Sequence, residues 1–197
     1  MKKLYFVLEL AMLGALLSGK IFAADTQDAV ALRPPKGARV AIVVFEDLQC
    51  PRCAIIAPQV EQTARNYNVP VIRHDFPLPM HSWSYDAAVL ARYFDTQSKE
   101  LGNEFRDTVF KSQNDITRGN LHDFAQKFAN DHKVDLPFVI DPQGKLAQEV
   151  NDDKNLGNRM GINHTPTIYV VTNKPASQPV EVNDESQLAQ SLEQARH

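Results

Sequence analysis

The sequence predicts an α/β fold in which a helical subdomain is inserted into a unit with a central mixed β-sheet. Three observations lead to this prediction. A β-branched, apolar run at residues 40–45 is followed by a helical pattern and a second strand pattern. Three apolar stripes at helical spacing come next, and strand patterns return only at 167–172 and 180–182. The stretch from Pro77 to His164 is far longer than the roughly dozen residues that a crossover between parallel strands requires.

The first part of the chain has the pattern of a strand, a helix and a second strand. Residues 40–45 suit a strand that is buried on both faces, because all of them are apolar and most are β-branched. A helix is expected over 51–67, with Pro51 in its first turn, where the missing N–H is harmless, and with Pro58 kinking it. The second strand is expected near 69–76, joined to the first by a right-handed parallel crossover.

Helices are expected to fill the middle of the chain and to close it. Apolar residues recur at helical spacing in three stripes: Ala87, Leu90, Ala91 and Phe94; Leu101, Phe105 and Val109; Leu121, Phe124, Ala125 and Phe128. A fourth helix is expected from Gly144 towards Met160, although polar residues and Gly157 interrupt its pattern. The two later strand patterns suit a hairpin, and a closing helix follows a capping box that begins at Asp184.

The composition suits one globular domain and gives no sign of a nucleic-acid partner. The chain has 197 residues, of which 43% are hydrophobic and 23% are charged. This balance supports a packed core. The formal net charge is −3 and no long basic run is present, so nucleic-acid binding is not indicated.

The first 38 residues divide into a targeting segment and a linker. Residues 1–23 have the pattern of a cleaved signal peptide, with two lysines before a short apolar run and small residues at its end. Glu9 and Lys20 interrupt the apolar character, which argues against a transmembrane helix. A retained anchor facing the periplasm is the alternative. Residues 24–38 are polar and suit a linker, and export would place the following domain in the periplasm, where disulfides persist.

Cys50 and Cys53, in Cys50-Pro51-Arg52-Cys53, are the candidate catalytic residues. They are the only cysteines of the chain, and their close spacing suits chemistry better than a structural staple. Cys50 falls at the predicted start of a helix, where unpaired backbone N–H groups and the helix dipole stabilise a thiolate. Cys53 lies one turn further on and is able to attack a mixed disulfide formed at Cys50.

Pro51 and Arg52 lie between the two cysteines, and the charge of Arg52 is able to approach the sulfur of Cys50. Dipole and cation together would lower the pKa of Cys50 from about 8.5 by roughly one to two units. Because this stabilises the reduced form, the pair is predicted to donate its disulfide. An inert disulfide or a zinc site is the alternative. Zinc would need two further ligands, and the sequence offers neither more cysteines nor a His-x₃₋₅-His pair.

The segment from Phe45 to Cys53, together with Thr165-Pro166-Thr167, resembles the DsbA-like branch of the thioredoxin superfamily. Phe76-Pro77-Leu78-Pro79 and the helices after it are also similar to that branch. The resemblance runs from about Arg39 to the C-terminus. It implies a thioredoxin-like fold with a central mixed β-sheet over 39–197, and a helical insertion at about 80–135.

The resemblance also implies the roles of the site residues. Cys50 would be the exposed nucleophile and Cys53 the resolving thiol, and the two would form the Cys50–Cys53 disulfide. Thr165–Pro166 would be a cis peptide beside that disulfide, with the Thr165 backbone pairing to an extended substrate. Expected substrates are unfolded, cysteine-containing polypeptides, and reoxidation is expected from a membrane quinone reductase of the DsbB or VKOR type. Neither an organic cofactor nor a metal is expected, and the protein is expected to be a monomer.

Two positions depart from the pattern of the family. Relatives often carry a buried acid six residues before the first cysteine, where this chain has Val44. Glu46, Asp47 and a water molecule are the candidate replacements, and the sequence does not choose among them. His164 stands where relatives often have glycine. It either adds a pH-dependent charge near the disulfide or is a solvated loop side chain, and the second interpretation is favoured.

The favoured function is that of a dithiol oxidase for exported proteins. A disulfide isomerase or reductase is the alternative among enzymes, and a peptide-binding chaperone with incidental thiols is the alternative outside them. Met80, Trp83 and Tyr85 either line a groove for unfolded substrates or belong to the core, and the core is favoured. The charged run Asp152-Asp153-Lys154 is expected to be a solvated turn.

Overall fold

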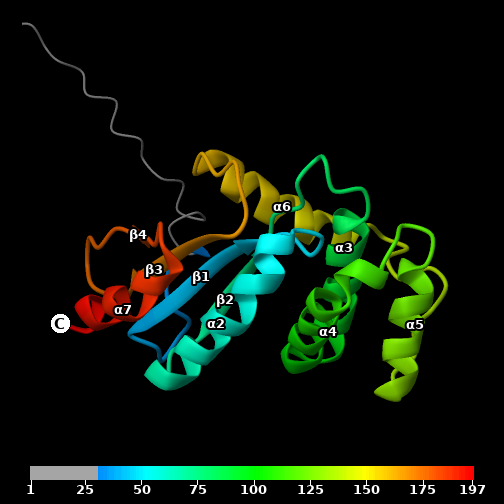
Figure 1. Cartoon of the computed structure of the whole chain (residues 1–197), viewed down its shortest axis with the longest axis horizontal. Coiled ribbons are helices and arrows are strands. Elements are labelled where there is room, and N and C mark those ends of the chain that lie inside the picture. The colour runs from blue at the N-terminus through cyan, green and yellow to red at the C-terminus, as the bar shows by residue number, and fades with distance from the viewer. Residues whose placement is uncertain (1–30) are drawn as a thin grey trace, which may run out of the picture.

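The computed structural model describes residues 31–197 (Figure 1). The predicted signal peptide at 1–23 and the first part of the predicted linker, 24–30, lie outside the described residues. Residues 31–197 form a four-stranded sheet with the strand order β2-β1-β3-β4. The strands are Val40–Glu46 (β1), Val71–Asp75 (β2), Thr167–Thr172 (β3) and Val180–Glu181 (β4). None of the helices in this part of the chain combines the length and the apolar character that crossing a membrane requires.

The sheet is mixed, as predicted, and β1 is one of its two central strands. β1 runs parallel to β2, with Ile42 opposite Val71, and antiparallel to β3, with Phe45 opposite Thr167. β3 also pairs with β4 as the predicted antiparallel hairpin. Every residue of β1 is buried, because helices cover both faces of the sheet.

Alternate residues of β1 belong to two different helical layers. Helices α2 (Pro51–Tyr67) and α7 (Leu188–Arg196) cover one face of the sheet, and α6 (Lys145–Arg159) covers the other (Figure 1). Because side chains alternate along a strand, the even-numbered residues of β1 pack in the first layer and the odd-numbered ones in the second. Even-numbered residues of β1 therefore face the helix that carries the cysteines, and odd-numbered residues face away from it.

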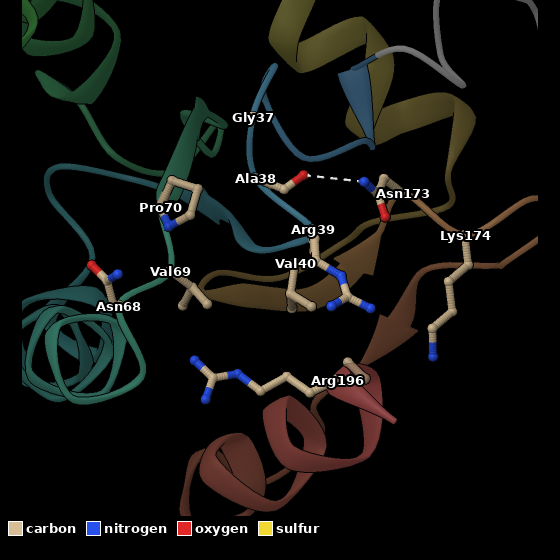
Figure 2. Close-up of a pocket in the computed structure, with 11 residues that line it drawn as sticks. Gly37, Ala38, Arg39, Val40, Asn68, Val69, Pro70, Asn173, Lys174 and Arg196 are labelled. Atoms are coloured by element: carbon tan, nitrogen blue, oxygen red, sulfur yellow. Dashed lines mark hydrogen bonds between the residues drawn. The ribbon is translucent and has the colours of Figure 1, made fainter.

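A hollow of about 350 Å³ lies at the end of the sheet where β1 begins and β3 ends (Figure 2). Arg39, Lys174 and Arg196 contribute basic side chains to its wall. The Arg196 guanidinium contacts the carbonyl oxygen of Tyr67 and lies 5.1 Å from the centre of the Tyr67 ring. One of these basic groups thus stabilises the C-terminal end of α2, where carbonyl oxygens lack helical partners.

Gly157 explains why the sequence pattern of α6 is interrupted. A Cβ atom at this position would lie 2.6 Å from the ring of Phe76 and 3.3 Å from the ring of Phe45. Glycine therefore lets α6 approach the aromatic side of the sheet more closely than any other residue would. The helix predicted from Gly144 towards Met160 is confirmed as α6.

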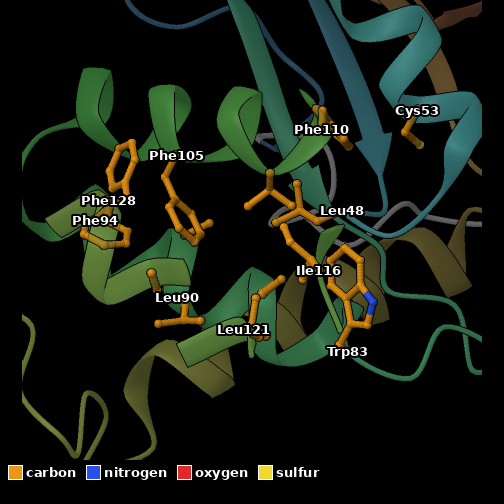
Figure 3. Close-up of a cluster of buried hydrophobic side chains, with 14 of the residues drawn as sticks. Leu48, Cys53, Trp83, Leu90, Phe94, Phe105, Phe110, Ile116, Leu121 and Phe128 are labelled. Atoms are coloured by element: carbon orange, nitrogen blue, oxygen red, sulfur yellow. The ribbon is translucent and has the colours of Figure 1, made fainter. Parts of the chain in front are cut away.

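Three helices from the middle of the chain form a bundle beside the sheet (Figure 1). They are α3 (Ser84–Gln97), α4 (Lys99–Lys111) and α5 (Leu121–Asp131). Their core is aromatic, and the rings of Phe94, Phe105 and Phe128 meet with centroids 4.6 to 5.1 Å apart. The same cluster extends to Leu48 and Cys53 (Figure 3). The core of the bundle and the cysteine pair are therefore packed against each other, whereas the boundaries of the insertion, about 80–135, stay a prediction.

The expectation that three aromatic or sulfur-containing residues after β2 belong to the core holds only in part. Trp83 is buried, with 4% of its surface exposed, but Met80 is 73% exposed. Tyr85 is half-buried and donates a hydrogen bond to the carbonyl oxygen of Ala147 at 3.2 Å. The core interpretation is wrong for Met80, because this residue lies in the loop that joins β2 to α3 and projects into solvent.

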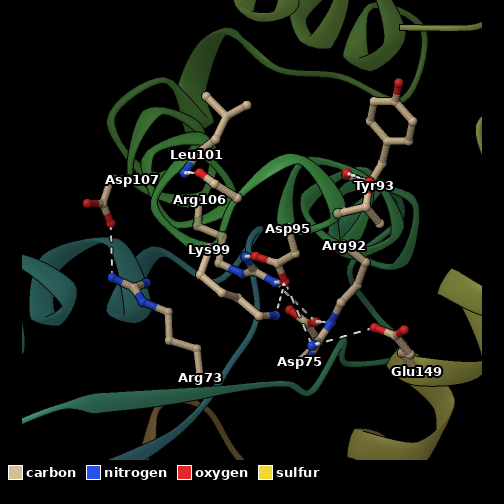
Figure 4. A network of polar contacts seen from close by, with 12 residues as sticks. Arg73, Asp75, Arg92, Tyr93, Asp95, Lys99, Leu101, Arg106, Asp107 and Glu149 are labelled. Atoms are coloured by element: carbon tan, nitrogen blue, oxygen red, sulfur yellow. Dashed lines mark hydrogen bonds and ion pairs between the residues drawn. The ribbon is translucent and has the colours of Figure 1, made fainter. Parts of the chain in front are cut away.

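Buried charges join the end of β2 to the helical bundle (Figure 4). Arg106, which is 2% exposed, donates two parallel hydrogen bonds to Asp95, at 2.9 and 3.0 Å. Arg92 donates to Asp75 at 2.5 Å and also bonds to Asp153. Asp153 was expected in a solvated turn, and this expectation is wrong. It lies on α6 with its side chain 15% exposed, because its carboxylate also accepts a hydrogen bond from the backbone amide of Asp75.

Arg106→Ala should destabilise the protein by about 3–5 kcal/mol, because it leaves the buried carboxylate of Asp95 without its main partner. Urea denaturation of the reduced protein measures this change in the free energy of unfolding. Lys127→Ala is the control, because Lys127 and Asp131 form an exposed pair on α5 whose loss should cost less than about 1 kcal/mol. Equal effects of the two substitutions would contradict the structural role of the buried network.

Candidate active site

Cys50 lies between a central strand and the helix that follows it. β1 ends at Glu46, a short turn follows, and Cys50 is the N-cap of α2, with Pro51 in the first turn as predicted. Cys50 is 7% exposed and Cys53 is 2% exposed. The expectation that Cys50 is exposed is therefore wrong, because the loop that carries Thr165 lies against its sulfur. Both are free thiols, so the structure describes the dithiol form, and the disulfide between them stays a prediction.

The loop before β3 lies against Cys50. Its Thr165–Pro166 peptide bond is cis, which is the geometry that the resemblance implies. The Cys50 thiol donates a hydrogen bond to the carbonyl oxygen of Thr165, with sulfur and oxygen 3.4 Å apart across 115 residues of sequence. Strand register accounts for this approach, because Thr167 pairs with Phe45 near the end of β1, where the chain turns towards the cysteines.

The surroundings of Cys50 lower the pKa of its thiol to about 5. The largest contribution is a hydrogen bond from the Cys53 thiol. Burial opposes it, while the Thr165 hydroxyl and the backbone amides of Cys53 and Arg52 lower the pKa further, because they can donate hydrogen bonds to the thiolate. These amides belong to the first turn of a helix, where N–H groups lack helical partners. The Thr165 hydroxyl is buried without a hydrogen-bond partner among the described residues, so it is available to a thiolate at Cys50.

Cys53 has the opposite environment. Burial raises the pKa of its thiol far above the ordinary value, and the hydrogen bond with Cys50 raises it further. The backbone amide of Asp47 donates a weak hydrogen bond to the sulfur, with nitrogen and sulfur 3.5 Å apart. At neutral pH Cys50 is therefore ionised, whereas Cys53 keeps its proton.

The guanidinium of Arg52 is held by Glu185, 133 residues further along the chain. Its Nη2 donates to both carboxylate oxygens, at 3.0 and 2.8 Å. The sequence predicted that this charge approaches the sulfur of Cys50. In the structure Arg52 lowers the pKa of Cys50 through its backbone amide instead, because Glu185 offers the guanidinium a carboxylate partner.

Asp47, one of the two acids before the cysteines, uses its buried carboxylate to hold two loops together. The carboxylate accepts hydrogen bonds from the backbone amides of Gln49 and Leu78, each at 2.7 Å. It also accepts from the hydroxyl of Ser84 at 2.5 Å and contacts Nδ1 of His81 at 2.7 Å. Asp47 thus fastens the turn before the cysteine pair to the loop that follows β2, and its oxygens are fully engaged in doing so.

Glu46, the other acid, lies next to Cys53. It is 4% exposed, and its carboxylate accepts hydrogen bonds from Nη1 of Arg73 at 3.1 and 3.2 Å. Burial raises the pKa of Glu46 above the ordinary value, and Arg73 partly opposes this. Glu46, Cys53 and Pro166 line a hollow of about 10 Å³, which is about the room that one water molecule needs. The negative charge of Glu46 also contributes to the raised pKa of Cys53.

His164 is exposed, and its Nδ1 lies 3.1 Å from the side-chain oxygen of Asn163. This placement agrees with the favoured interpretation of a solvated loop side chain. Together with Arg52, Glu185 and Pro166, it lines an open hollow of about 170 Å³. A chain lying in this hollow would touch the cis-proline loop beside Cys50.

Three residues near the cysteines carried no signal in the sequence. Gln113, in the short helix η1 (Gln113–Asp115), donates to the carbonyl oxygens of Leu48 and Cys50, at 2.8 and 3.0 Å. Arg73 in β2 and Glu185 in the short helix η2 (Glu185–Gln187) are the others. Each reaches the site from an element remote in sequence, so only the fold reveals its role. Among residues 31–197, no group of three or more His, Cys, Asp or Glu side chains is placed to hold a metal ion.

Known proteins resemble this chain in both sequence and fold. The family model described as Thioredoxin matches residues 35–186. A variant of α-DsbA1 from Wolbachia pipientis superposes with a TM-score of 0.68 at 18% identity, covering 85% of this chain and 94% of that one. A periplasmic thioredoxin-like protein from Salmonella enterica serovar Typhimurium superposes with a TM-score of 0.68 at 15% identity, covering 87% and 97%. Pseudomonas aeruginosa DsbA2 gives a TM-score of 0.60 at 17% identity, covering 83% and 92%.

Curated relatives match over part of their own length only. The Na(+)/H(+) antiporter NhaA 1 of Mycobacterium sp. (strain KMS) is 26% identical over 145 residues. The match covers 71% of this chain and 23% of the antiporter, so the chain spans about a quarter of the length of that relative. The likeness concerns a segment that this chain shares with a much longer protein.

The alkylation of Cys50 by iodoacetamide should follow a pKa of about 5. Because the thiolate is the reactive form, the rate should rise with pH, reach half its maximum near pH 5 and be flat at neutral pH. An ordinary thiol would still be gaining reactivity at about pH 8.5. The rate at each pH can be followed by mass spectrometry of the reduced protein.

Thr165→Val is the companion variant, because it keeps the shape of the side chain and removes the hydroxyl. It should move the midpoint of alkylation upward by about one pH unit, since a hydrogen bond to an ionised sulfur is lost. A midpoint near pH 8.5 in the unsubstituted protein, about that of an ordinary thiol, would contradict the description of the site.

Proposed function

This chain belongs to the thioredoxin family, and from that premise we propose that it is a DsbA-like thiol–disulfide oxidoreductase that introduces disulfide bonds into other proteins. The observation that carries the proposal is the contrast between the two sulfurs. The pKa of Cys50 is lowered to about 5, whereas the pKa of Cys53 is raised by its deeper burial. We assign the nucleophile to Cys50 and the resolving thiol to Cys53.

The low pKa of Cys50 favours the oxidising direction. A thiol of low pKa is a good leaving group, so a mixed disulfide at Cys50 is released readily to a second thiolate. A site that stabilises the Cys50 thiolate also stabilises the reduced protein, which makes the disulfide form a stronger oxidant. The reduction potential should then lie well above the roughly −270 mV of a thioredoxin. A potential near that value would favour the alternative function of a reductase.

The proposed reaction begins with the oxidised pair. A substrate thiolate attacks the sulfur of Cys50, a new disulfide forms between them, and the Cys50–Cys53 bond breaks. Cys53 leaves with the electron pair and takes up a proton, which its raised pKa favours. A second substrate thiolate then attacks the substrate sulfur of the mixed disulfide, and Cys50 leaves as a thiolate. Two electrons pass from the substrate to the protein.

We propose that Glu46 exchanges the proton with Cys53. It would take the role of the buried acid that relatives carry at the position of Val44. Its pKa is raised by burial, and it borders the same small hollow as Cys53. Asp47 is less suited to this task, because its carboxylate is engaged by four groups of the surrounding loops.

The surroundings of the protein in the cell follow from the same proposal. We propose export to the periplasm by cleavage of the segment 1–23, a linker at 24–38 and a DsbA-like domain at 39–197. The Salmonella neighbour is described as a periplasmic protein, which supports this placement. The proposed substrates are unfolded, cysteine-containing polypeptides, which the open hollow beside Thr165 and Pro166 would accept. Reoxidation is assigned to a membrane quinone reductase of the DsbB or VKOR type.

Substituting the two cysteines one at a time tests the division of roles. Cys50→Ser should reduce the reactivation of reduced ribonuclease to the uncatalysed rate, because the Cys50–Cys53 disulfide can no longer form. Cys53→Ser should instead trap a mixed disulfide when its Cys50 thiolate attacks a disulfide bond of oxidised, scrambled ribonuclease, because no resolving thiol remains to release the substrate; mass spectrometry detects the product. If Cys50→Ser left the reactivation unchanged, the protein would be a chaperone with incidental thiols.

Glu46→Gln should slow the oxidation of the reduced protein by glutathione disulfide. The step affected is the attack of Cys53 on the mixed disulfide, because this attack requires the loss of a buried proton, and the rate should fall at least ~100-fold. Stopped-flow fluorescence of the single tryptophan, Trp83, can follow the reaction, since Trp83 packs in the same cluster as Cys53.

Glu61→Gln is the matched control for this substitution. Glu61 also receives a hydrogen bond from Arg73, at 2.8 Å, but it lies outside the hollow that Glu46 shares with Cys53. The reduced Glu61→Gln variant should therefore be oxidised at a rate within about twofold of that of the unsubstituted protein. Equal slowing by the two variants would mean that the proton exchange at Cys53 does not depend on Glu46.

A further inference from the structure

The residue pair between the cysteines is tied to the C-terminal part of the chain by one side chain. Arg52 is 57% exposed and its position on the first turn of α2 would let it swing towards several neighbours. In the structure its Nη2 contacts both carboxylate oxygens of Glu185, at 2.8 and 3.0 Å. The Glu185 side chain is only 19% exposed, so the less mobile partner is the acid.

Glu185 is itself held by the local fold. It is the first residue of η2, directly after Asp184, whose side chain accepts a hydrogen bond from the backbone amide of Ser186 at 2.9 Å. The segment continues into α7, which packs against α2 and β3. The carboxylate of Glu185 is therefore presented to Arg52 from a fixed position, in the wall of the hollow that the cis-proline loop also lines.

We propose that Glu185 is a positioning residue that holds the Arg52 guanidinium away from the sulfur of Cys50. The Cys50–Cys53 disulfide is thereby a weaker oxidant than it would be if Arg52 were not bound to Glu185. This inference deepens the proposed function and rests on it for the direction of the reaction. The ion pair between Arg52 and Glu185 is partly exposed, so it contributes little to stability, and little free energy is needed for Arg52 to leave Glu185 for another partner. A positive charge close to the Cys50 thiolate stabilises the reduced protein, so the position of the Arg52 guanidinium affects the reduction potential of the disulfide.

Glu185→Gln should free the guanidinium and stabilise the Cys50 thiolate. The equilibrium constant with glutathione should shift by about two- to fivefold towards the reduced protein, which corresponds to a rise in reduction potential of about 9–21 mV. The alkylation midpoint of Cys50 should fall by a matching amount. These are measurements on the thiols of the intact protein, so they stand even if the protein fails to oxidise ribonuclease.

A double-substitution cycle separates positioning from a direct effect of charge. If Glu185 acts by holding Arg52, the effect of Glu185→Gln should largely disappear in a protein that already carries Arg52→Ala. An undiminished effect in that background would mean that the carboxylate acts directly on Cys50, and it would overturn the proposal. No change in the potential with Arg52 present would overturn it as well.

Glu181→Gln is the control within the same hollow. The Glu181 carboxylate accepts a hydrogen bond from the hydroxyl of Tyr169 at 3.3 Å, whereas Arg52 is bonded to Glu185, so the potential should stay unchanged. Thermal unfolding of the reduced variants completes the test. If Glu185→Gln lowered the unfolding temperature and left both thiol measurements unchanged, Glu185 would be an anchor of η2 only, and the inference would be wrong.

Discussion

The hydrogen bonds that converge on the sulfur of Cys50 are the interaction on which the site depends. They come from the first turn of α2, from the thiol of Cys53 and from the side chain of Thr165. The carbonyl oxygen of Thr165, 115 residues away in sequence, also accepts a hydrogen bond from the Cys50 thiol. Only the sheet can bring these groups together. β1 leads into α2, and the antiparallel pairing of β3 with β1 places the loop before Thr167 beside the same helix end. The lowered pKa of Cys50 thus depends on the register of β3 against β1.

The helical bundle is attached to this site by two kinds of contact. Apolar packing extends from the aromatic rings of the bundle to Leu48 and Cys53, so the burial of Cys53 depends on the bundle as well as on the sheet. Charged contacts fix the other end, where Asp75 at the end of β2 meets arginines of α3 and α4. Buried ion pairs add little net stability but are costly to break, and they define one arrangement of the bundle against the sheet.

Much of the fold could be predicted because apolar periodicity reports local structure. The strand at 40–45, the helix over 51–67 and the three apolar stripes correspond to observed elements. The roles of some other residues were not predicted, because they depend on contacts with segments remote in sequence. Asp153 and Gly157 look like breaks in a helix, yet one carries a buried ion pair and the other admits the ring of Phe76. The contact of Arg52 with Glu185 spans 133 residues and joins two polar positions, which no local pattern marks.

The alternation of side chains along β1 also limits where a buried acid can lie close to Cys53. Even-numbered residues of this strand face α2, which carries Cys53, and odd-numbered residues face α6. An acid moved from position 44 to position 46 therefore stays on the face of the cysteine, whereas one at position 45 would point to the opposite layer. Arg73 on the neighbouring strand β2 pairs with Val44 in register and reaches along the same face to Glu46. A shift of two residues thus moves the acid along one face of the strand without taking it away from the helix that it has to reach.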